Sequence, residues 1–388
     1  MGVALLVCAP AWGEEQRPAE AGTQFVSPSL ETSSPAFSLQ GTDLVDALDT
    51  GSSGANEDGK GNFVIAPLPF SNELIGVGLV LGAGYVYSRA DASDKARHSV
   101  LGGGGMYADS GSWAAMLGHR GYWSLDRYRS TVGAVTGDLV YNLELNIRGS
   151  NTRFGIAQAF KGAVVDGAKR IGTSAWVGVG FLYGTTSIDV KLGDPPPIDA
   201  IEPDTTIDMS NLLLKGEWDT RDSDFYPRGG HFAAATATLS REDFGSQTDY
   251  DILEVEYNGY RSIAEDEVLA WRAYAKVVGD DAPFFAMAWF GSGCDLRGYT
   301  PGRYIGKSLF AAQVEWRWRP LPRWGFVAFG GAGSVTGTID DTSTDNWLPA
   351  AGAGVRFKLI KSMDLNLRAD VAWGRDDQTF TLSVGEAF

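Results

Sequence analysis

Residues 294–320 read CDLRGYTPGRYIGKSLFAAQVEWRWRP, and they join a glycine-rich loop that holds an arginine to a strictly alternating strand. One face of that strand is apolar and the other is mostly polar or charged. A repeat of two residues, with aromatic rings on one side and charges on the other, is typical of a strand between an apolar phase and water. The apolar face consists of Phe310, Ala312, Val314, Trp316 and Trp318, and the other of Ala311, Gln313, Glu315, Arg317 and Arg319.

The same alternation recurs along the chain and predicts an all-β fold, a transmembrane antiparallel β-barrel. A soluble all-β protein with one wet face is the alternative. The barrel is favoured because polar sides stay regular along whole strands, while apolar sides carry large aromatic residues near their ends. The clearest repeats are LVYNLELNIR at 139–148, SNLLLKGEWD at 210–219, MDLNLRADVAW at 363–373 and FTLSVGEAF at 380–388.

Composition supports one barrel and excludes some functions. Among 388 residues, 50 are glycine, 12% are aromatic and only 21% are charged, which suits many short strands that bend as a sheet closes. The chain lacks a run of the roughly 18 to 20 apolar residues that a spanning helix requires, so we expect it to cross a bilayer with strands. A net charge of -16 argues against binding nucleic acid, whose phosphates would be repelled.

Turn-forming clusters from Phe70 onward divide the chain into sixteen predicted strands, an even number typical of bacterial barrels. Three long excursions, at 192–206, 280–304 and 338–347, are predicted to be outer loops. The predicted strands are 74–88, 97–109, 111–122, 126–137, 138–148, 152–163, 173–189, 209–220, 229–241, 248–262, 266–279, 307–319, 324–337, 349–360, 363–374 and 378–388.

The amino-terminal part does not share this periodicity. Residues 1–13 resemble a secretory signal peptide without its basic leader, so the true start could lie upstream. Residues 14–64 are polar and are predicted to form a flexible periplasmic segment, or else a loose plug in the lumen. The barrel is expected over 65–388. If Cys8 leaves with the signal, Cys294 remains alone and no intramolecular disulfide forms.

The segment Leu296, Arg297, Gly298 and Tyr299 resembles the arginine-glycine-aromatic motif of the BamA/TamA superfamily of outer-membrane assembly and secretion barrels. The segments that follow it, and those at 67–87 and 216–232, resemble the family in the same order, so the resemblance covers about 65–388. It implies that a long extracellular loop folds back into the lumen, where the tip arginine meets acidic residues of the inner wall. Family members usually carry periplasmic POTRA domains of about 75 residues, so this chain resembles a short branch without them.

One position departs from the family. Many relatives carry an aspartate where this chain has Gly331, so the usual carboxylate opposite the loop arginine is missing. A guanidinium in a narrow lumen loses hydration and needs a carboxylate or several acceptors. We therefore expect Arg297 to pair with Glu315 on the polar face of the next strand. Asp219 is the second choice, and Glu217 lies on the same polar face.

In the family, the first and last strands meet at a weak seam that opens sideways. Here these are predicted to be 74–88 and 378–388. Glycines at the first strand would thin the side-chain contacts, although simple curvature explains them equally well. The last strand places Phe380, Leu382 and Phe388 on its apolar face, and in bacterial barrels a terminal aromatic strand also labels the chain for assembly. The glycines are Gly76, Gly78, Gly82 and Gly84.

Catalytic motifs are lacking: His98, His119 and His231 have no serine or aspartate at motif spacing. We expect no enzyme activity, metal or cofactor. The predicted function is assembly, insertion or translocation of outer-membrane proteins, with outer-membrane lipids, client barrels or a periplasmic protein as partners. A passive pore or structural barrel is the first alternative. An outer-membrane hydrolase is the second.

Overall fold

The computed structural model describes residues 62–72, 74–87, 99–147, 150–191, 205–223, 225–292, 295–337, 347–358 and 365–388. The predicted signal peptide, residues 14–61, His98 and Cys294 lie outside these ranges. Among the described residues, no helix has the length and apolar character needed to cross a membrane.

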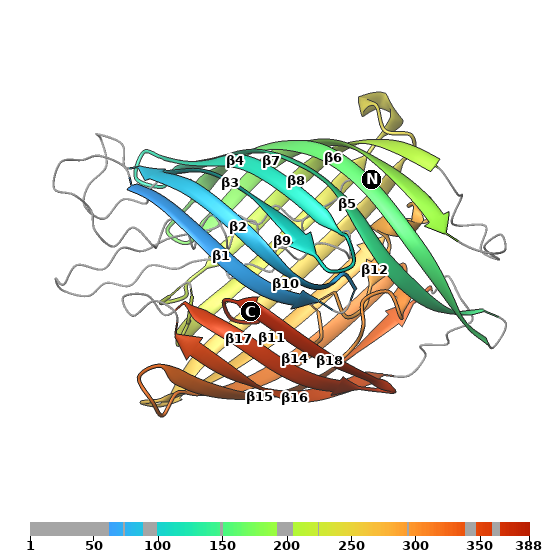
Figure 1. Ribbon diagram of the computed structural model, residues 1–388. Coiled ribbons are helices and arrows are strands. Elements are labelled where there is room, and N and C mark those ends of the chain that lie inside the picture. Colours follow the sequence, from blue (N-terminus) through green and yellow to red (C-terminus); the bar gives the residue numbers. More distant parts are fainter. Residues whose placement is uncertain are drawn as a thin grey trace.

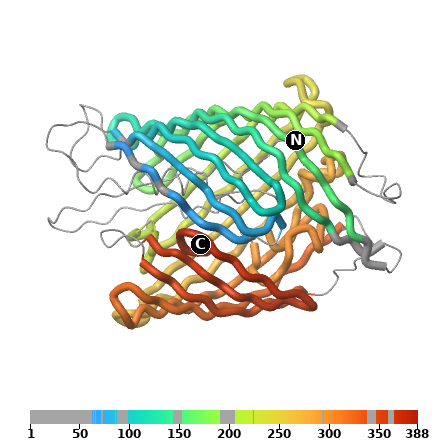
Figure 2. Tube along the Cα trace, in the orientation of Figure 1, coloured from blue at the N-terminus to red at the C-terminus, as the bar shows by residue number. Residues whose placement is uncertain are grey.

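Sixteen of the described strands form one closed antiparallel barrel (Figure 1, Figure 2). Each strand pairs with its neighbours in the sequence, except that β11 pairs with β14 and that β1 pairs with β18 to close the barrel. The barrel strands are β1 Asn62–Asn72, β2 Gly76–Tyr87, β3 Ser99–Ala108, β4 Trp113–Trp123, β5 Tyr128–Ile147, β6 Ser150–Ile171, β7 Ala175–Lys191, β8 Thr205–Asp219, β9 Gly229–Ser240, β10 Tyr250–Ala264, β11 Glu267–Val278, β14 Ser308–Trp318, β15 Trp324–Thr336, β16 Leu348–Lys358, β17 Asn366–Gly374 and β18 Asp377–Val384.

The predicted number of strands is confirmed, but one predicted division is wrong, one strand was not predicted, and β6 runs to Ile171, past the predicted end at 163. The predicted strands 126–137 and 138–148 are one strand, β5, which pairs with β6 without interruption from Tyr128 to Ile147. Glycine and aspartate at 137 and 138 resemble a turn but continue the ladder. The first strand was not predicted, and it contains Pro67 and Pro69, which are unusual in a strand interior. An edge strand tolerates them, and β1 therefore precedes the strand predicted at 74–88.

The two faces of the barrel wall differ sharply in polarity. Large apolar side chains project outward: Val179 of β7 is 53% exposed and Leu117 of β4 is 63% exposed. Charged side chains project inward, where Arg129 is 2% exposed and Glu315 is fully buried. This arrangement reverses that of a soluble protein and fits a barrel surrounded by hydrocarbon.

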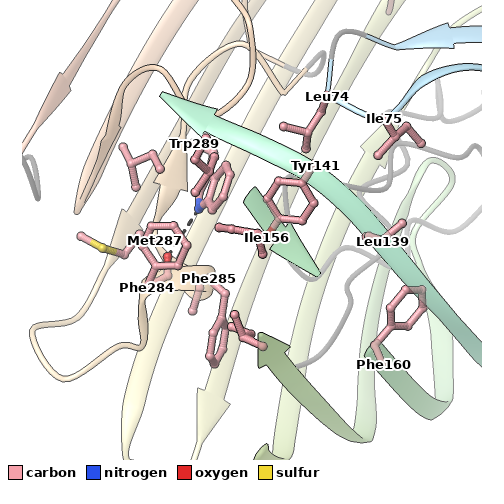
Figure 3. Packing of buried hydrophobic residues seen from close by; sticks show 14 of the residues in the cluster. Leu74, Ile75, Leu139, Tyr141, Ile156, Phe160, Phe284, Phe285, Met287 and Trp289 are labelled. Carbon is pink, nitrogen blue, oxygen red and sulfur yellow. Dashed lines mark hydrogen bonds between the residues drawn. The ribbon is translucent and has the colours of Figure 1, made fainter. Parts of the chain in front are cut away.

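The segment between β11 and β14 folds into the barrel. It contains the short helix η2 Phe284–Ala286 and the two-residue strands β12 Ala288–Trp289 and β13 Ile305–Gly306, which pair with each other. Figure 3 shows Phe284 and Trp289 of this loop on the side of Tyr141 and Ile156 of the wall, and all four belong with Met287 to one buried apolar cluster. The rings of Trp289 and Tyr141 meet edge to face, with centroids 6.4 Å apart. The loop is therefore held by apolar packing as well as by the charges described below.

The closing contact between β1 and β18, here called the seam, is much shorter than the other pairings around the barrel. In the part of the chain that the structure describes, β1 and β18 share one residue pair, Ser71 with Leu382. In contrast, β18 pairs with β17 from Asp377 to Val384. In Figure 1 the seam lies between the blue strand β1 and the dark red strand β18.

The end of the chain does not continue on the outer face. β18 stops at Val384, and Gly385 adopts a left-handed conformation with φ of 92°, which glycine reaches without strain. The chain then turns into the barrel, where Phe388 is fully buried. The expectation that Phe388 lies on the outward apolar face is therefore wrong. Phe380 does face outward and is 51% exposed, whereas Leu382 lies at the seam.

Replacing Val179 with arginine tests the orientation of the wall. A guanidinium midway across a hydrocarbon layer is expected to lower the free energy of unfolding by about 2–4 kcal/mol. Urea titration of the barrel in lipid vesicles measures the change. The matched control is Phe244→Arg in the short helix η1 Glu242–Phe244, where the exposed ring lies outside the barrel wall. The control is expected to stay within about 0.5 kcal/mol of the parent, and equal effects at both positions would contradict a lipid-facing wall.

Candidate functional site

The loop motif reaches the inner wall through a sharply turned backbone. Gly298 has φ of 105°, and a Cβ there would lie 3.1 Å from the backbone nitrogen of Gly374. Gly291 is also left-handed, and the N–H of Gly291 donates to the Asp295 carboxylate at 2.7 Å. These two glycines let the backbone press against the wall. Arg297 is thereby carried to the polar faces of β14 and β17.

Arg297 contacts two carboxylates there. Its Nη2 lies 2.6 Å from Oε2 of Glu315, and its Nη1 lies 2.8 Å from Oδ2 of Asp370. Nε and Nη2 donate to Oε1 of Gln313 at 3.3 and 3.2 Å. The guanidinium carbon is 3.4 Å from the centre of the Phe329 ring, so the flat face of the group is stacked while its edge is hydrogen-bonded. Arginine is suited to all of these contacts at once.

Two arginines of the wall complete the cluster. Nη1 of Arg356 lies 2.5 Å from Oδ1 of Asp370, and Nη2 of Arg356 lies 3.6 Å from Oε2 of Glu315. Nε of Arg317 lies 2.7 Å from Oε1 of Glu315. Each carboxylate is thus shared between the loop arginine and at least one wall arginine. A buried charge network of this kind fixes its members in place, because breaking one pair leaves its partner uncompensated.

The structure explains the departure at position 331. A Cβ on Gly331 would collide with the backbone oxygen of Ala312, so the strand pairing leaves no room for an aspartate side chain there. Asp370, on β17, supplies a carboxylate to the loop arginine instead.

The other motif residues anchor the loop. Leu296 is 1% exposed and belongs to an apolar cluster with Phe290 and Tyr304. Tyr299 donates its hydroxyl hydrogen to the carbonyl oxygen of Pro349 at 2.6 Å, and the same hydroxyl oxygen accepts the N–H of Arg375 at 2.9 Å. Burial raises the pKa of Tyr299, because the phenolate would lose its hydration. The neutral phenol can therefore act as both donor and acceptor.

Glu217 and Asp219 lie inside the barrel, but they contact other arginines. Glu217 lies 3.0 Å from Arg129, and Asp219 lies 3.2 Å from Arg221. Both carboxylates are on β8, which is not among the strands that Arg297 contacts.

The four glycines predicted at the seam are placed differently by the structure. Gly76, Gly78, Gly82 and Gly84 belong to β2, which pairs with β1 on one side and β3 on the other. They are therefore one strand away from the seam, and the assignment of 74–88 as the seam strand is wrong.

The described histidines belong to aromatic contacts of the barrel wall. Nε2 of His119 is 2.8 Å from the Tyr87 hydroxyl. Nδ1 of His231 is 2.8 Å from the Tyr257 hydroxyl, and its ring stacks on Trp218 with centroids 6.1 Å apart. Each ring thus engages a tyrosine rather than an aligned serine or carboxylate.

Sequence reasoning missed several members of the charge cluster. The alternating repeat at 363–373 puts Asp370 on the polar face of its strand, but alternation alone does not tell which strand faces the loop tip. Gln313 and Arg317 share the polar face of β14 with Glu315, and this shared face was a signal for their proximity. Arg356 stands in a glycine-rich stretch without a clear alternating pattern, and Phe329 was assigned no role.

Comparison with known proteins supports the architecture. The Omp85 superfamily domain matches residues 138–388. No curated protein matches the sequence. Among solved structures, BamA from Haemophilus ducreyi lacking POTRA domains 1-3 is similar with a TM-score of 0.60 and 13% identity, over 84% of this chain and 70% of that one. CdiB from Acinetobacter baumannii has a TM-score of 0.56 and 12% identity, over 84% and 59% of the two chains. CdiB from Escherichia coli has a TM-score of 0.55 and 11% identity, over 89% and 69%.

Replacing Arg297 with alanine tests the cluster. The change is expected to cost about 3–5 kcal/mol of unfolding free energy, since Glu315 and Asp370 lose a buried partner. It should also expose the loop to trypsin at Arg303. Arg297→Lys should recover only part of the loss, because an ammonium cannot bridge both carboxylates with the same geometry.

The control for that change is Arg241→Ala, which removes an exposed pair with Asp251 and should cost about 1 kcal/mol or less. Urea titration and timed proteolysis measure both effects. If alanine at 297 proved no more costly than alanine at 241, the cluster would not hold the loop.

Proposed function

Since the chain belongs to the Omp85 superfamily, we propose that it works in the bacterial outer membrane as an assembly or translocation barrel, which inserts other barrel proteins or passes a polypeptide. The proposed partners are outer-membrane lipids, client barrel proteins and a periplasmic protein that delivers the clients. The proposal extends to the amino-terminal residues, with 1–13 as a signal peptide and the part of 14–64 that precedes β1 as a periplasmic segment.

The short seam is the observation that carries this proposal. A closed barrel is stable in lipid because every backbone group pairs within the sheet. Among the described residues, β1 and β18 share only the pair of Ser71 and Leu382, so their separation breaks far fewer hydrogen bonds than the separation of any other two neighbours in the barrel. Opening there would present two strand edges, and an exposed edge can pair with an incoming strand.

The occupied lumen favours a lateral route over a passive pore. The loop between β11 and β14 is fixed at one end by packing of Trp289 and Phe284 against the wall, and at the other by Arg297. The inner wall carries both cations and anions in paired form, as for Arg272 with Glu256 at 2.7 Å. A permanently conducting channel would require this loop to leave.

Locking the seam tests the proposal. Cysteines at Ser71 and Leu382 stand opposite each other, a spacing suited to a disulfide. Vesicles containing the locked barrel are expected to lose at least about tenfold in the rate at which an added outer-membrane barrel folds into them, with recovery on reduction. The rate is followed by the heat-modifiable mobility of the client.

A matched lock between β17 and β18 controls for the disulfide itself. Val371 and Phe380 face each other across that pairing, and cysteines there should leave client folding unchanged. If the seam lock has no effect on several clients, the assembly role fails. Ion conductance that is independent of the lock, together with unassisted client folding, would instead favour the pore.

A further inference from the structure

The backbone groups of two prolines in β1, Pro67 and Pro69, face the seam. In a strand, backbone groups of successive residues point alternately to the two neighbouring strands. Val77 of β2 points toward β3, since its carbonyl accepts the N–H of Asp109 at 2.9 Å. The backbone N–H and C=O groups of even-numbered residues in β2 therefore face β1, and those of the even-numbered residues opposite them in β1 face β2. The odd-numbered residues of β1, which include Pro67, Pro69 and Ser71, point toward β18.

The same reasoning gives the orientation of β18. The N–H of Gly385 donates to the carbonyl of Asn366, which precedes the rest of β17, at 2.8 Å. Odd-numbered residues near the end of β18 thus point toward β17, and even-numbered residues point toward β1. The pair of Ser71 and Leu382 is therefore one in which both residues direct their backbone groups at each other.

The ladder stops where the prolines begin. If it continued in the same register, Val384 would lie opposite Pro69 and Glu386 opposite Pro67. Proline has no N–H, so each of these two pairs would form one hydrogen bond instead of two. A strand edge that lacks alternate donors is a poor partner for extension of the sheet.

The segment that would extend β18 is bound elsewhere. Oε2 of Glu386 accepts a hydrogen bond from Nε of Arg356 at 2.7 Å, and its Oε1 accepts one from Asn366 at 2.6 Å. Nη2 of Arg317 donates to the backbone oxygen of Phe388 at 2.6 Å. The side chains of Glu386 and Phe388 are buried, at 2% and 0% exposure.

The ring of Phe388 has an apolar site of its own in the barrel. It packs in a cluster with Tyr260, Ala270 and Ala387. The Arg317 guanidinium carbon lies 5.5 Å from the centre of the Phe388 ring. The segment is thus seated by charge, hydrogen bonds and apolar contact together.

We propose that Pro67 and Pro69 set the extent of the seam: they stop the ladder at Ser71 and leave residues 385–388 to dock in the lumen on Arg317 and Arg356. These two arginines also hold Glu315, the partner of Arg297. The seam strand and the lumenal loop therefore share one charge network. The inference goes beyond the proposed function, because it concerns the barrel alone and requires no client.

Cross-linking measures which position the segment occupies. Cysteines at Ala66 and Ala387 would lie opposite each other only if the ladder continued past Ser71. They are introduced into a chain whose Cys8 and Cys294 are replaced by serine, and the rate of disulfide formation is compared with that of the pair at Ser71 and Leu382. In the parent, the new pair should form at least about tenfold more slowly than the reference pair.

Replacing both Pro67 and Pro69 with threonine restores two donors on a residue type that favours strands. Cross-linking of the new pair is expected to rise about tenfold, in line with two added hydrogen bonds. Pro349→Thr in β16 is the matched control and should leave the rate unchanged. Heat-modifiable mobility verifies that every variant is folded.

Glu386→Gln separates the effect of the two prolines from the effect of the contacts that hold Glu386 in the lumen. With both prolines present, releasing this side chain from Arg356 should raise cross-linking less than the double threonine change does, because the β1 edge still lacks donors. The proposal is overturned if the parent cross-links the new pair as fast as the reference pair. It is equally overturned if threonine at both positions has no effect while glutamine at 386 alone produces the full rise.

Discussion

The structure depends on the pairing of charged groups that are buried inside the barrel. Moving a guanidinium into a buried position costs several kcal/mol unless carboxylates and further acceptors surround it. Arg297 satisfies this requirement only where β14 and β17 present Glu315 and Asp370 side by side, so the loop tip has one favourable position. The wall arginines face the same constraint and meet it with the same carboxylates. Loop, wall and chain end are consequently fixed by one set of contacts rather than by separate ones.

The need for hydrogen-bond partners also explains why the barrel is weakest at its seam. Closing a sheet requires donors and acceptors on both meeting edges, and β1 lacks two donors where β18 would continue. A soluble sheet with such an edge would expose it to other chains, and proline is a common means of preventing that pairing. Here the edge is instead the closing strand of a barrel, so the prolines leave the cylinder with one point of easy separation. Residues 385–388 avoid the poor edge by turning inward at Gly385.

Alternation along single strands was enough to predict the architecture but not its closure. The polar and apolar faces of 307–319 and 363–374 give the orientation of each wall segment. Successive side chains of a strand point to opposite sides of the wall, so polar residues mark the inward positions and apolar residues the outward ones. Proximity between distant strands carries no such local signal, so Asp370 was placed on the correct face of its strand and still not connected with Arg297. The first strand, β1, was not predicted, and it is a related case. A residue that argues against a central strand is acceptable at an edge, and a sequence does not say which strand will be the edge.

The shared network also implies an order of costs for any movement of the seam. Withdrawing residues 385–388 from the lumen takes Glu386 from Arg356 and a backbone acceptor from Arg317. Arg356 then keeps Asp370, and Arg317 keeps Glu315, so neither guanidinium is left without a carboxylate. Moving the loop tip instead removes Arg297 from two buried carboxylates and from the Phe329 ring at once. Displacing the chain end therefore costs less free energy than displacing the loop tip. After its release, Arg317 and Arg356 still contact Glu315 and Asp370, the two carboxylates that also bind Arg297. Strand separation at the seam can accordingly begin with the chain end while the loop stays in place.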